Sequence, residues 1–477
     1  MKKILITTAI DYTNDIIHIG HAYQKIVADC LARFYRLSGW KVFFLTGTDE
    51  YGTTNESAAK KAGKAPQKYV DEISKKDKEQ LLSLNISFDR FIRTTDKDHA
   101  QTVNDFYLKV FQAGDIYQGE YEGLYCEGCE AYKTLTELTD GCCSLHLTRQ
   151  IKKVNEMNYF FRWSKYRKFL IDRLKNQPTF IFPKSKGKEM LAFLKQGLDD
   201  IPISRPKFKV SWGIPVPNDA SQNIYVWFDA LINYYTAGSQ TGFWDNKTKI
   251  IHILGKDNLR WHALLWPAML RSAGLRLPDE IFAHGFINLE GKKISKSLGN
   301  VIRPTELISQ FGSDAVRYFF LKYGPAVEDV DISVEKIKKV YNSELANDWG
   351  NLAQRVARLC EKTVSKTDAV KDSVTTKKPC RFKFSENVAS HLQYFQIPLA
   401  LDNICRRITK TNQFINKKEP WKKKGKELEK ILSCAVQEIR QIAYDLQPFM
   451  PESSTKILKQ FSAKQIRLEK PYFLRKK

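Results

Sequence analysis

The chain alternates between short apolar runs typical of buried strands and a segment with helical spacing, and this alternation limits its fold more than any other feature. Lys3–Ile10 and Val42–Leu45 are the apolar runs. Between them, apolar residues recur on one face of a helix, at Val27, Cys30, Leu31 and Phe34. Strands that are covered on both faces are continuously apolar, and a strand, a helix and a strand in this order form a parallel βαβ unit. We therefore predict an α/β fold with a parallel sheet.

The same pattern returns later in the chain, after an interruption. Residues 115–150 are rich in Gly, Tyr, Glu and Cys, which indicates an insertion with a small fold of its own. Buried strands are predicted again at Ile250–Leu254 and Glu280–Ile287, and Asp314 is expected to cap a helix over Ala315–Leu321. In the last third of the chain only helical spacing is convincing, so this part is predicted to be an all-α bundle.

Composition excludes some classes of protein. Of the 477 residues, 43% are hydrophobic and 27% are charged, which is typical of a globular protein. No apolar run approaches the roughly 18 residues of a membrane span, and no signal peptide precedes the first strand, so a cytoplasmic protein without a membrane partner is expected. The net charge of +24 suits a polyanionic partner, although solvated lysines would explain it equally well.

Two short polar motifs could carry chemistry. His18–His21 (HIGH) lies between the first strand and the first helix, where open α/β sheets bind ligands. Its imidazoles could donate hydrogen bonds to a phosphate, and Gly20 would let that phosphate approach the backbone. Lys293–Ser297 (KISKS) places two lysines in a polar loop, where they could neutralise a triphosphate. Each motif alone has a plainer explanation: the histidines cap the helix, and the lysines form a solvated loop.

The insertion contains a cluster of cysteines. Nine cysteines in a chain without secretory features argue against a disulfide framework. Two residues separate Cys126 from Cys129 and Cys143 from His146, and each such step lets two ligands bind one tetrahedral ion. The spacing predicts one structural zinc held by these four residues. Cys142 remains an alternative ligand, and reduced cysteines without a metal are the other interpretation.

Together the two polar motifs resemble the HIGH and KMSKS signatures of the class I aminoacyl-tRNA synthetases, which bracket a split dinucleotide-binding (Rossmann-like) fold. Ile294 stands where the second signature usually has Met. Longer blocks are similar to the bacterial-type methionyl-tRNA synthetases, and they extend over nearly the whole chain: Thr7–Ile10, Tyr12, Phe44–Glu50, Asn158–Arg162, Trp212–Pro217, Tyr225–Tyr234, Gly255–Asp257 and Trp266–Ala268.

This resemblance implies a two-step ligase reaction. Methionine and ATP, with Mg²⁺ on the phosphates, would form methionyl adenylate, and the methionyl group would then pass to the 3′-terminal adenosine of tRNA(Met), including the initiator tRNA. The residues that would stabilise the transition state are His18, His21, Lys293 and Lys296. The residues that would bind ATP are Gly20, Gly255, Asp257, Ser295 and Lys296, with Asp257 at the ribose.

The resemblance also implies a methionine pocket formed by Ala9, Ile10, Tyr12, Asp49, Trp227, Ala230, Leu231, Tyr234 and His262. Asp49 ends a buried strand, where its carboxylate could pair with the substrate's α-ammonium group. A thioether contacts aromatic rings favourably, although any single aromatic residue here could be ordinary helix core. Three positions depart from the family pattern: Asp11, Tyr51 and Asn258. Asn258 would need a hydrogen-bond partner in an apolar pocket.

In the helical last third, the resemblance implies anticodon reading by Asn351, Arg355 and Trp421. Asn351 and Arg355 are four residues apart on one helix face, and lysines surround Trp421. An aromatic plane, a guanidinium and an amide suit splayed single-stranded bases. A bundle core residue beside a solvated lysine run is the alternative.

The expected division of the chain has five parts: a first catalytic half (1–114), a connective insertion with the zinc knuckle (115–195), a second catalytic half (196–325), a connecting stem (326–345) and a helical anticodon-binding domain (346–477). No dimerisation module is recognised, so a monomer is expected. The competing hypotheses are a sister synthetase for valine, leucine, isoleucine or cysteine, and a zinc-bearing RNA-binding protein without catalysis. The short insertion, the zinc ligands within it and the two intact signatures argue against them.

Overall fold

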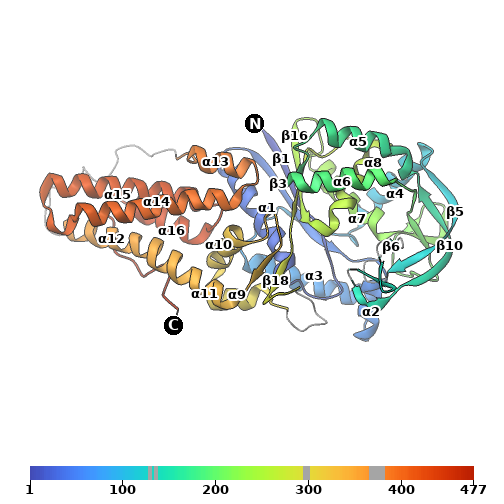
Figure 1. Cartoon of the computed structure of the whole chain (residues 1–477), viewed down its shortest axis with the longest axis horizontal. Helices are drawn as coiled ribbons and strands as arrows, with labels where there is room; N and C mark the ends of the chain where they lie inside the picture. The colour runs from blue at the N-terminus through green and yellow to red at the C-terminus, as the bar shows by residue number, and fades with distance from the viewer. Residues whose placement is uncertain (127–130, 134–137, 145, 294–300, 365–381, 477) are drawn as a thin grey trace. The chain divides into compact units, whose positions relative to one another are not determined.

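The structure is a computed structural model that describes residues 1–126, 131–133, 138–144, 146–293, 301–364 and 382–476 (Figure 1). The chain forms two compact units, each assembled from separate stretches of sequence. The first unit comprises Met1–Ile17, Lys41–Gln80 and Phe88–His284. The second comprises His18–Trp40, Leu81–Ser87 and Gly285–Lys477.

A seven-stranded sheet forms the centre of the first unit. Its order is β11-β17-β16-β1-β3-β2, with β4 also paired to β3, and every pair is parallel. The strands are β1 (Lys3–Thr8), β2 (Asp11–Tyr12), β3 (Lys41–Asp49), β4 (Arg90–Arg93), β11 (Ile181–Phe182), β16 (Thr248–Gly255) and β17 (Glu280–His284). The predicted α/β fold with a parallel sheet is confirmed, and the carboxyl ends of β1, β3 and β16 lie at one edge.

The sheet strands are apolar because helices of the same unit cover them. Ile4, Leu5 and Ile6 of β1 and Ile250 and Ile251 of β16 are completely buried. The helices of this unit are α2 (Thr53–Lys61), α3 (Pro66–Ser83, whose last turn belongs to the second unit), α4 (Lys97–Gln112), α5 (Arg167–Asn176), α6 (Lys184–Gln196), α7 (Val226–Gln240) and α8 (Trp266–Ser272). A π-helical turn, Trp261–Leu265, leads into α8.

The insertion predicted at 115–150 contains strands of its own. Its main feature is a long antiparallel pair, β5 (Ile116–Cys126) with β10 (Lys152–Phe161), in which Ile116 lies opposite Phe161. β6 (Ala131–Lys133) and β12 (Ile201–Pro202) extend this pair to a four-stranded sheet. A second small sheet contains β7 (Leu138–Thr139), β8 (Cys142–Cys143) and β9 (His146–Gln150), and a third, after the insertion, contains β13 (Ser204–Pro206), β14 (Pro215–Val216) and β15 (Asp219–Ile224). Sequence spacing did not predict this antiparallel arm.

The second unit is mainly helical. Its helices are α1 (Ile19–Leu37), α9 (Pro304–Phe311), α10 (Ser313–Tyr323), α11 (Val334–Val340), α12 (Asn351–Val364), α13 (Glu386–Gln393), α14 (Ile397–Lys418), α15 (Gly425–Leu446) and α16 (Pro451–Phe461). A π-helical stretch, Tyr341–Gly350, joins α11 to α12. A small sheet has the order β19 (Lys292–Lys293), β18 (Ile287–Leu289), β20 (Val330–Ile332). Within the described ranges no strand follows β20 (Val330–Ile332), as predicted for the last third.

The predicted role of Asp314 is wrong. Gly312 is the N-cap of α10, and Asp314 lies in the first turn of that helix. Its carboxylate instead accepts hydrogen bonds from the backbone N–H and hydroxyl of Ser453, both at 2.6 Å. Ser453 lies in the first turn of α16, so Asp314 caps a helix other than its own.

Candidate active site

The carboxyl edge of the central sheet gathers residues from distant parts of the sequence. Ala9 follows β1, Asp49 ends β3 and Gly255 ends β16, and β1 is hydrogen-bonded to both of the other strands. Tyr12 in β2 lies opposite Asp49 in the parallel register. Ligands of open α/β sheets bind outside the carboxyl ends of the strands, so this edge is the candidate site.

A buried hydrogen-bonded pair forms one wall of this site. The Tyr234 hydroxyl in α7 lies 2.7 Å from His262 Nε2, and His262 Nδ1 lies 2.8 Å from the main-chain oxygen of Asn258. A carbonyl only accepts, so Nδ1 carries the hydrogen, and Nε2 accepts from Tyr234. Burial lowers the pKa of His262 to about 4, so the imidazole is neutral near pH 7. Asn258 thus contributes its carbonyl to the site, and its side chain is half-buried.

Aromatic rings and small apolar groups complete the predicted methionine wall. Trp227 stacks on Trp261 with ring centroids 4.7 Å apart. Ala9, Leu231 and Tyr234 share one apolar cluster with Trp261, and Ile10 and Trp227 pack against it. Ala230 is buried as well. The structure therefore brings most of the predicted pocket residues together within the first unit.

Sequence reasoning missed two residues of this wall. Trp261 lies in the π-helical turn, whose geometry no spacing rule anticipates. His252, in β16, contacts Tyr234 with the two rings tilted by 36° and their centroids 4.5 Å apart, and its Nδ1 lies 2.6 Å from the Thr7 hydroxyl. Burial lowers the pKa of His252 well below its usual value. His252 could have been found from the sequence, because a histidine within an apolar strand run is unusual.

Two buried carboxylates lie at the same edge of the sheet. Asp49, at the end of β3, is 5% exposed, and Asp11, in the neighbouring β2, is 7% exposed. Burial raises the pKa of Tyr234, and the charges of Asp49 and Asp11 raise it further. Tyr51 packs on Trp212, with ring centroids 5.2 Å apart, and its pKa is raised by burial and by the charges of Asp229 and Glu50.

Gly255 and Asp257 form the part of the edge expected to bind ATP. Gly255 has φ −70° and ψ 148°, an ordinary extended conformation. A Cβ atom at this position would lie 2.6 Å from Asp257 Oδ1 and 3.7 Å from His284 Cε1. The absence of a side chain at residue 255 therefore gives the exposed Asp257 carboxylate its place beside the end of β16.

The HIGH motif begins α1 in the second unit. The Gly20 N–H donates to His18 Nδ1 (3.0 Å), the His18 N–H donates to His21 Nδ1 (3.3 Å), and the two rings stack at 3.9 Å. The histidines do cap the helix, as the plainer explanation proposed. Because both Nδ1 atoms accept, each neutral ring carries its hydrogen on Nε2 and can donate from there.

The KISKS motif follows a hairpin in the same unit. β18 (Ile287–Leu289) pairs antiparallel with β19 (Lys292–Lys293), through a turn in which Gly291 has φ +74°. Lys293 contributes its backbone to β19, whereas Ser295 and Lys296 lie outside the described residues. Just after the motif, Ile302 O accepts a hydrogen bond from Ile19 N at 3.0 Å. Ile302, five residues beyond the motif, therefore lies beside the start of α1, which carries the HIGH motif.

The predicted zinc ligands are only partly described. Cys126 ends β5 and Cys143 lies in β8, and both are completely buried. Cys143 pairs with His146 across the β8–β9 turn, whereas Cys142 pairs with Gln150. Cys129 lies outside the described residues. Within the described part of the chain, no cluster of three metal-ligating side chains is present.

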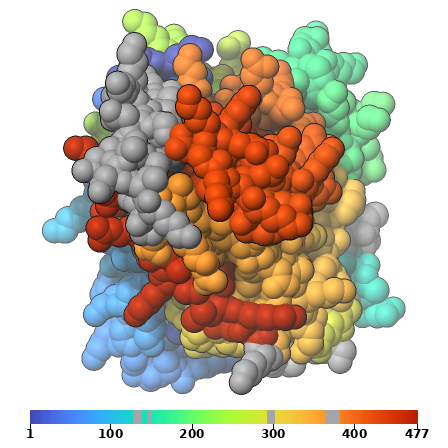
Figure 2. All heavy atoms as spheres, turned by 90° about the vertical axis from the view of Figure 1, so that its left-hand side faces the viewer, coloured from blue at the N-terminus to red at the C-terminus, as the bar shows by residue number. Residues whose placement is uncertain are grey.

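The residues expected to read the anticodon lie in the second unit. Asn351 begins α12, and the Arg355 guanidinium donates to Asn416 near the end of α14 (2.7 Å). Trp421 follows in a short 3₁₀ turn, Pro420–Lys422, and is 52% exposed. Figure 2 faces the orange-red turn between α14 and α15 that carries it. Because the Trp421 side chain is exposed, it is not part of the bundle core, which was the alternative explanation for this residue.

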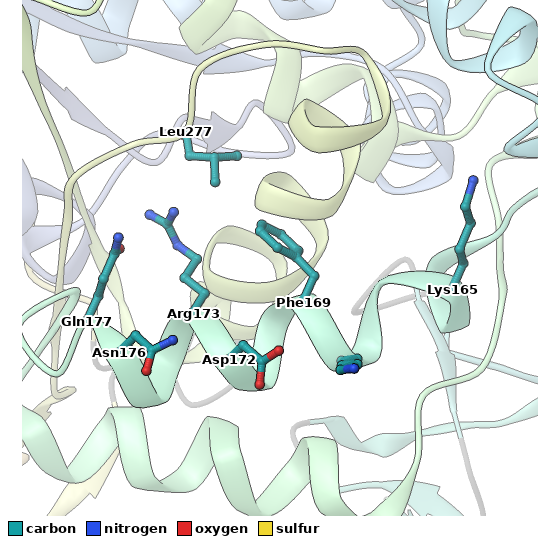
Figure 3. A pocket seen from close by; sticks show the side chains of 8 residues that line it. Lys165, Phe169, Asp172, Arg173, Asn176, Gln177 and Leu277 are labelled. Atoms are coloured by element: carbon teal, nitrogen blue, oxygen red, sulfur yellow. The ribbon is translucent and has the colours of Figure 1, made fainter.

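A surface hollow of about 610 Å³ lies elsewhere on the first unit (Figure 3). It is lined by Lys165, Lys168, Phe169, Asp172, Arg173, Asn176, Gln177 and Leu277. Gln177 precedes β11 and Leu277 precedes β17, so the hollow is near the amino ends of these strands. None of the predicted site residues lines it.

Comparisons with known proteins agree with one another. The family model "tRNA synthetases class I (M)" matches residues 4–154 and 129–357. The methionine–tRNA ligase of Synechocystis is 41% identical over 475 residues, which cover 95% of this chain and 88% of that protein. The chloroplastic/mitochondrial methionine–tRNA ligase of Arabidopsis thaliana is 40% identical over 478 residues, which cover 96% and 77%.

A solved structure is similar over the same extent. The Mycobacterium tuberculosis methionyl-tRNA synthetase bound by methionyl-adenylate superposes with a TM-score of 0.88 at 35% identity, covering 99% of this chain and 98% of that one. Among the described residues, no helix has the length and apolar character that crossing a membrane requires.

Proposed function

The chain belongs to the methionyl-tRNA synthetases, a family of class I tRNA synthetases, and from this premise we propose how its own residues activate methionine and load it onto tRNA(Met). The observation that carries the proposal is the buried, hydrogen-bonded Tyr234–His262 pair, together with the buried Asp49 and Asp11 at the carboxyl edge of the sheet. This arrangement offers an apolar, uncharged wall next to negative charge, which is the complement of methionine's thioether and α-ammonium groups.

Methionine binds with its ammonium group at Asp49 and its side chain against Trp227, Tyr234 and His262. A neutral His262 suits an uncharged side chain, because a buried imidazolium would need a counterion. The hydrogen bond from Tyr234 and the one to Asn258 fix both the tautomer and the orientation of the ring. Ala9, Ile10, Tyr12, Ala230 and Leu231 close the rest of the pocket.

The activation step needs charge stabilisation and positioning rather than a protein nucleophile. An oxygen of the methionine carboxylate attacks the α-phosphorus of MgATP, the bond to the bridging oxygen breaks, and pyrophosphate leaves with the electron pair. Nε2–H of His18 and of His21 donate to the α-phosphate oxygens, Gly20 permits close approach, and Lys293, Ser295 and Lys296 neutralise the leaving group. Asp257 binds the ribose beside Gly255.

In the second step, a hydroxyl of the terminal adenosine of tRNA attacks the methionyl carbonyl carbon, and AMP leaves. Recognition of the tRNA anticodon is assigned to Asn351, Arg355 and Trp421. The initiator tRNA is included among the substrates. The exposed Trp421 ring provides a stacking surface for a base. Lys422 and Lys423 pair with Glu419 and Glu427, so other nearby lysines, Lys417, Lys418 and Lys424, are assigned to the phosphates.

The cysteine cluster is assigned one structural zinc. Its donor set, the thiolates of Cys126, Cys129 and Cys143 and the imidazole of His146, fits a closed tetrahedral site. The buried Cys126 and Cys143, and the pairing of Cys143 with His146, favour this set over one that includes Cys142. Such an ion would link the insertion's strands and would take no part in the reaction. We also keep the five-part domain division, a monomeric state and a cytoplasmic location as proposals.

The test is amino-acid-dependent ATP–pyrophosphate exchange with each of the twenty amino acids. Methionine should support the fastest exchange, and the purified enzyme should then charge tRNA(Met). Exchange that prefers valine, leucine, isoleucine or cysteine would contradict the substrate, and absence of exchange with all twenty would contradict the reaction.

A further inference from the structure

A fully buried ion pair holds helix α1 inside the second unit. Arg317 Nη2 and Asp29 Oδ2 are 2.6 Å apart, and both side chains have no exposed surface. The remaining polar atoms are also satisfied. Arg317 donates to the main-chain oxygens of Leu84, Pro448 and Phe449, at 3.3, 3.0 and 3.1 Å. Asp29 accepts from the Ser87 N–H and from Arg33 Nε. A buried charge that keeps so many directed bonds is costly to assemble and defines its geometry closely.

This network joins α1 to three other segments. Arg317 lies on α10, Leu84 and Ser87 belong to the 81–87 stretch, and Pro448 and Phe449 form the corner between α15 and α16. Apolar contacts alone would allow α1 to slide or rotate, because they have no direction. The Arg317 guanidinium binds one carboxylate and three carbonyl groups at once, and these directed bonds prevent α1 from sliding or rotating.

We propose that Arg317, acting through Asp29, is a positioning residue that sets where α1 presents His18 and His21 to ATP. This role rests on the proposed function of the two histidines. Asp29 is eight residues from His21, about 12 Å along a continuous helix. A displacement of α1 at Asp29 is therefore passed to the start of the helix. In a reaction that depends on positioning, an error of about 1 Å costs about a hundredfold in rate.

The test measures methionine-dependent pyrophosphate exchange by Arg317→Lys, which keeps a buried, paired charge but loses the fork to Pro448 and Phe449. The expected kcat, per folded and active-site-titrated enzyme, falls about tenfold or more, and the KM for methionine stays within twofold. Arg33→Lys is the matched control, since Arg33 binds the same carboxylate but is partly exposed and reaches Asn85 instead. It should stay within twofold of wild type.

Combination with a background that lacks both histidines, His18→Ala with His21→Ala, separates positioning from general damage. If Arg317 acts through the histidines, Arg317→Lys should cost less than threefold in that background, because the groups it positions are already gone. Equal losses in both backgrounds, or a folded Arg317→Lys enzyme with wild-type kcat, would overturn the proposal. If Arg317→Lys unfolds below the assay temperature, Asp29→Asn replaces it in the same comparison of the two backgrounds. Wild-type enzyme without methionine-dependent exchange would instead refute the proposed function.

Discussion

Replacing Gly255 by alanine adds one methyl group at the point where β16 ends beside the Asp257 carboxylate. The backbone there, with φ −70° and ψ 148°, is open to any residue, so the change brings no backbone strain. The new Cβ would lie 2.6 Å from Asp257 Oδ1, closer than any real contact, and 3.7 Å from His284 Cε1, an ordinary contact. The substitution therefore moves the carboxylate of Asp257 and little else.

The expected loss follows from the bond that Asp257 is proposed to make with the ribose. A hydrogen bond to a charged group contributes about 1.5–3 kcal/mol, which corresponds to about a tenfold to 150-fold loss of kcat/KM for ATP. The KM for methionine should change less than twofold, because no pocket residue is displaced. Pyrophosphate exchange at varied ATP and at varied methionine measures both quantities, and thermal unfolding should be unchanged within about 2 °C.

Asp257→Ala is the matched comparison. It should reproduce the loss, and the double variant should be no worse than Asp257→Ala alone, since the methyl group then has no carboxylate to displace. A folded Gly255→Ala enzyme with a wild-type KM and kcat for ATP would refute the reasoning, as would fully additive losses.

Three further results are expected. Burial holds the pKa of His262 at about 4, below its ordinary value of 6.5, so the stability that comes from keeping this ring neutral is present above about pH 6.5 and is lost as the pH falls from there to about 4. Methionine binding, followed by tryptophan fluorescence, should therefore stay constant from pH 8 to 5.5. A binding transition centred near pH 6.5 would contradict a neutral His262. Trp421→Ala should lower kcat/KM for tRNA by about fivefold to 150-fold, from about 1–3 kcal/mol of lost base stacking, while pyrophosphate exchange is unchanged; equal losses in both assays would contradict a role confined to the tRNA. Cys143→Ala should reduce bound zinc, measured by elemental analysis, from one equivalent towards none, whereas Cys142→Ala should retain it. The reverse result would make Cys142 the ligand in place of Cys143.

The sheet and its carboxyl edge could be predicted because their signals are local. Buried parallel strands are apolar runs, as in Lys3–Ile10, and a polar residue at the end of such a strand, as at Asp49, marks the carboxyl edge. Trp261 and the β5–β10 arm were not predictable in this way. Trp261 contacts Trp227 from a π-helical turn, and the pairing of β5 with β10 joins residues 27 to 45 positions apart.

Asp314 shows a different limit. A residue type identifies what a side chain can do, and Asp is a good helix cap, but it does not identify which helix is capped. Asp314 binds the N–H of Ser453, 139 positions away in sequence, because α10 lies beside the start of α16 in the folded unit. Only tertiary packing determines that choice.

Helix capping and ATP binding at the HIGH motif, which sequence reasoning treated as rivals, are compatible, because the capping contacts use only one nitrogen of each ring. Each imidazole has one nitrogen occupied by a backbone N–H at the start of α1, which holds the ring in place and fixes the hydrogen on Nε2. A histidine without this cap could rotate or adopt the other tautomer, and would then present an acceptor to a phosphate oxygen. Gly20 belongs to the same device, because a Cβ atom there would lie 2.8 Å from His18 Cε1 and would push the capping ring away. Nδ1 of each ring therefore binds the helix start, and the hydrogen stays on Nε2, the donor proposed for the phosphate oxygens.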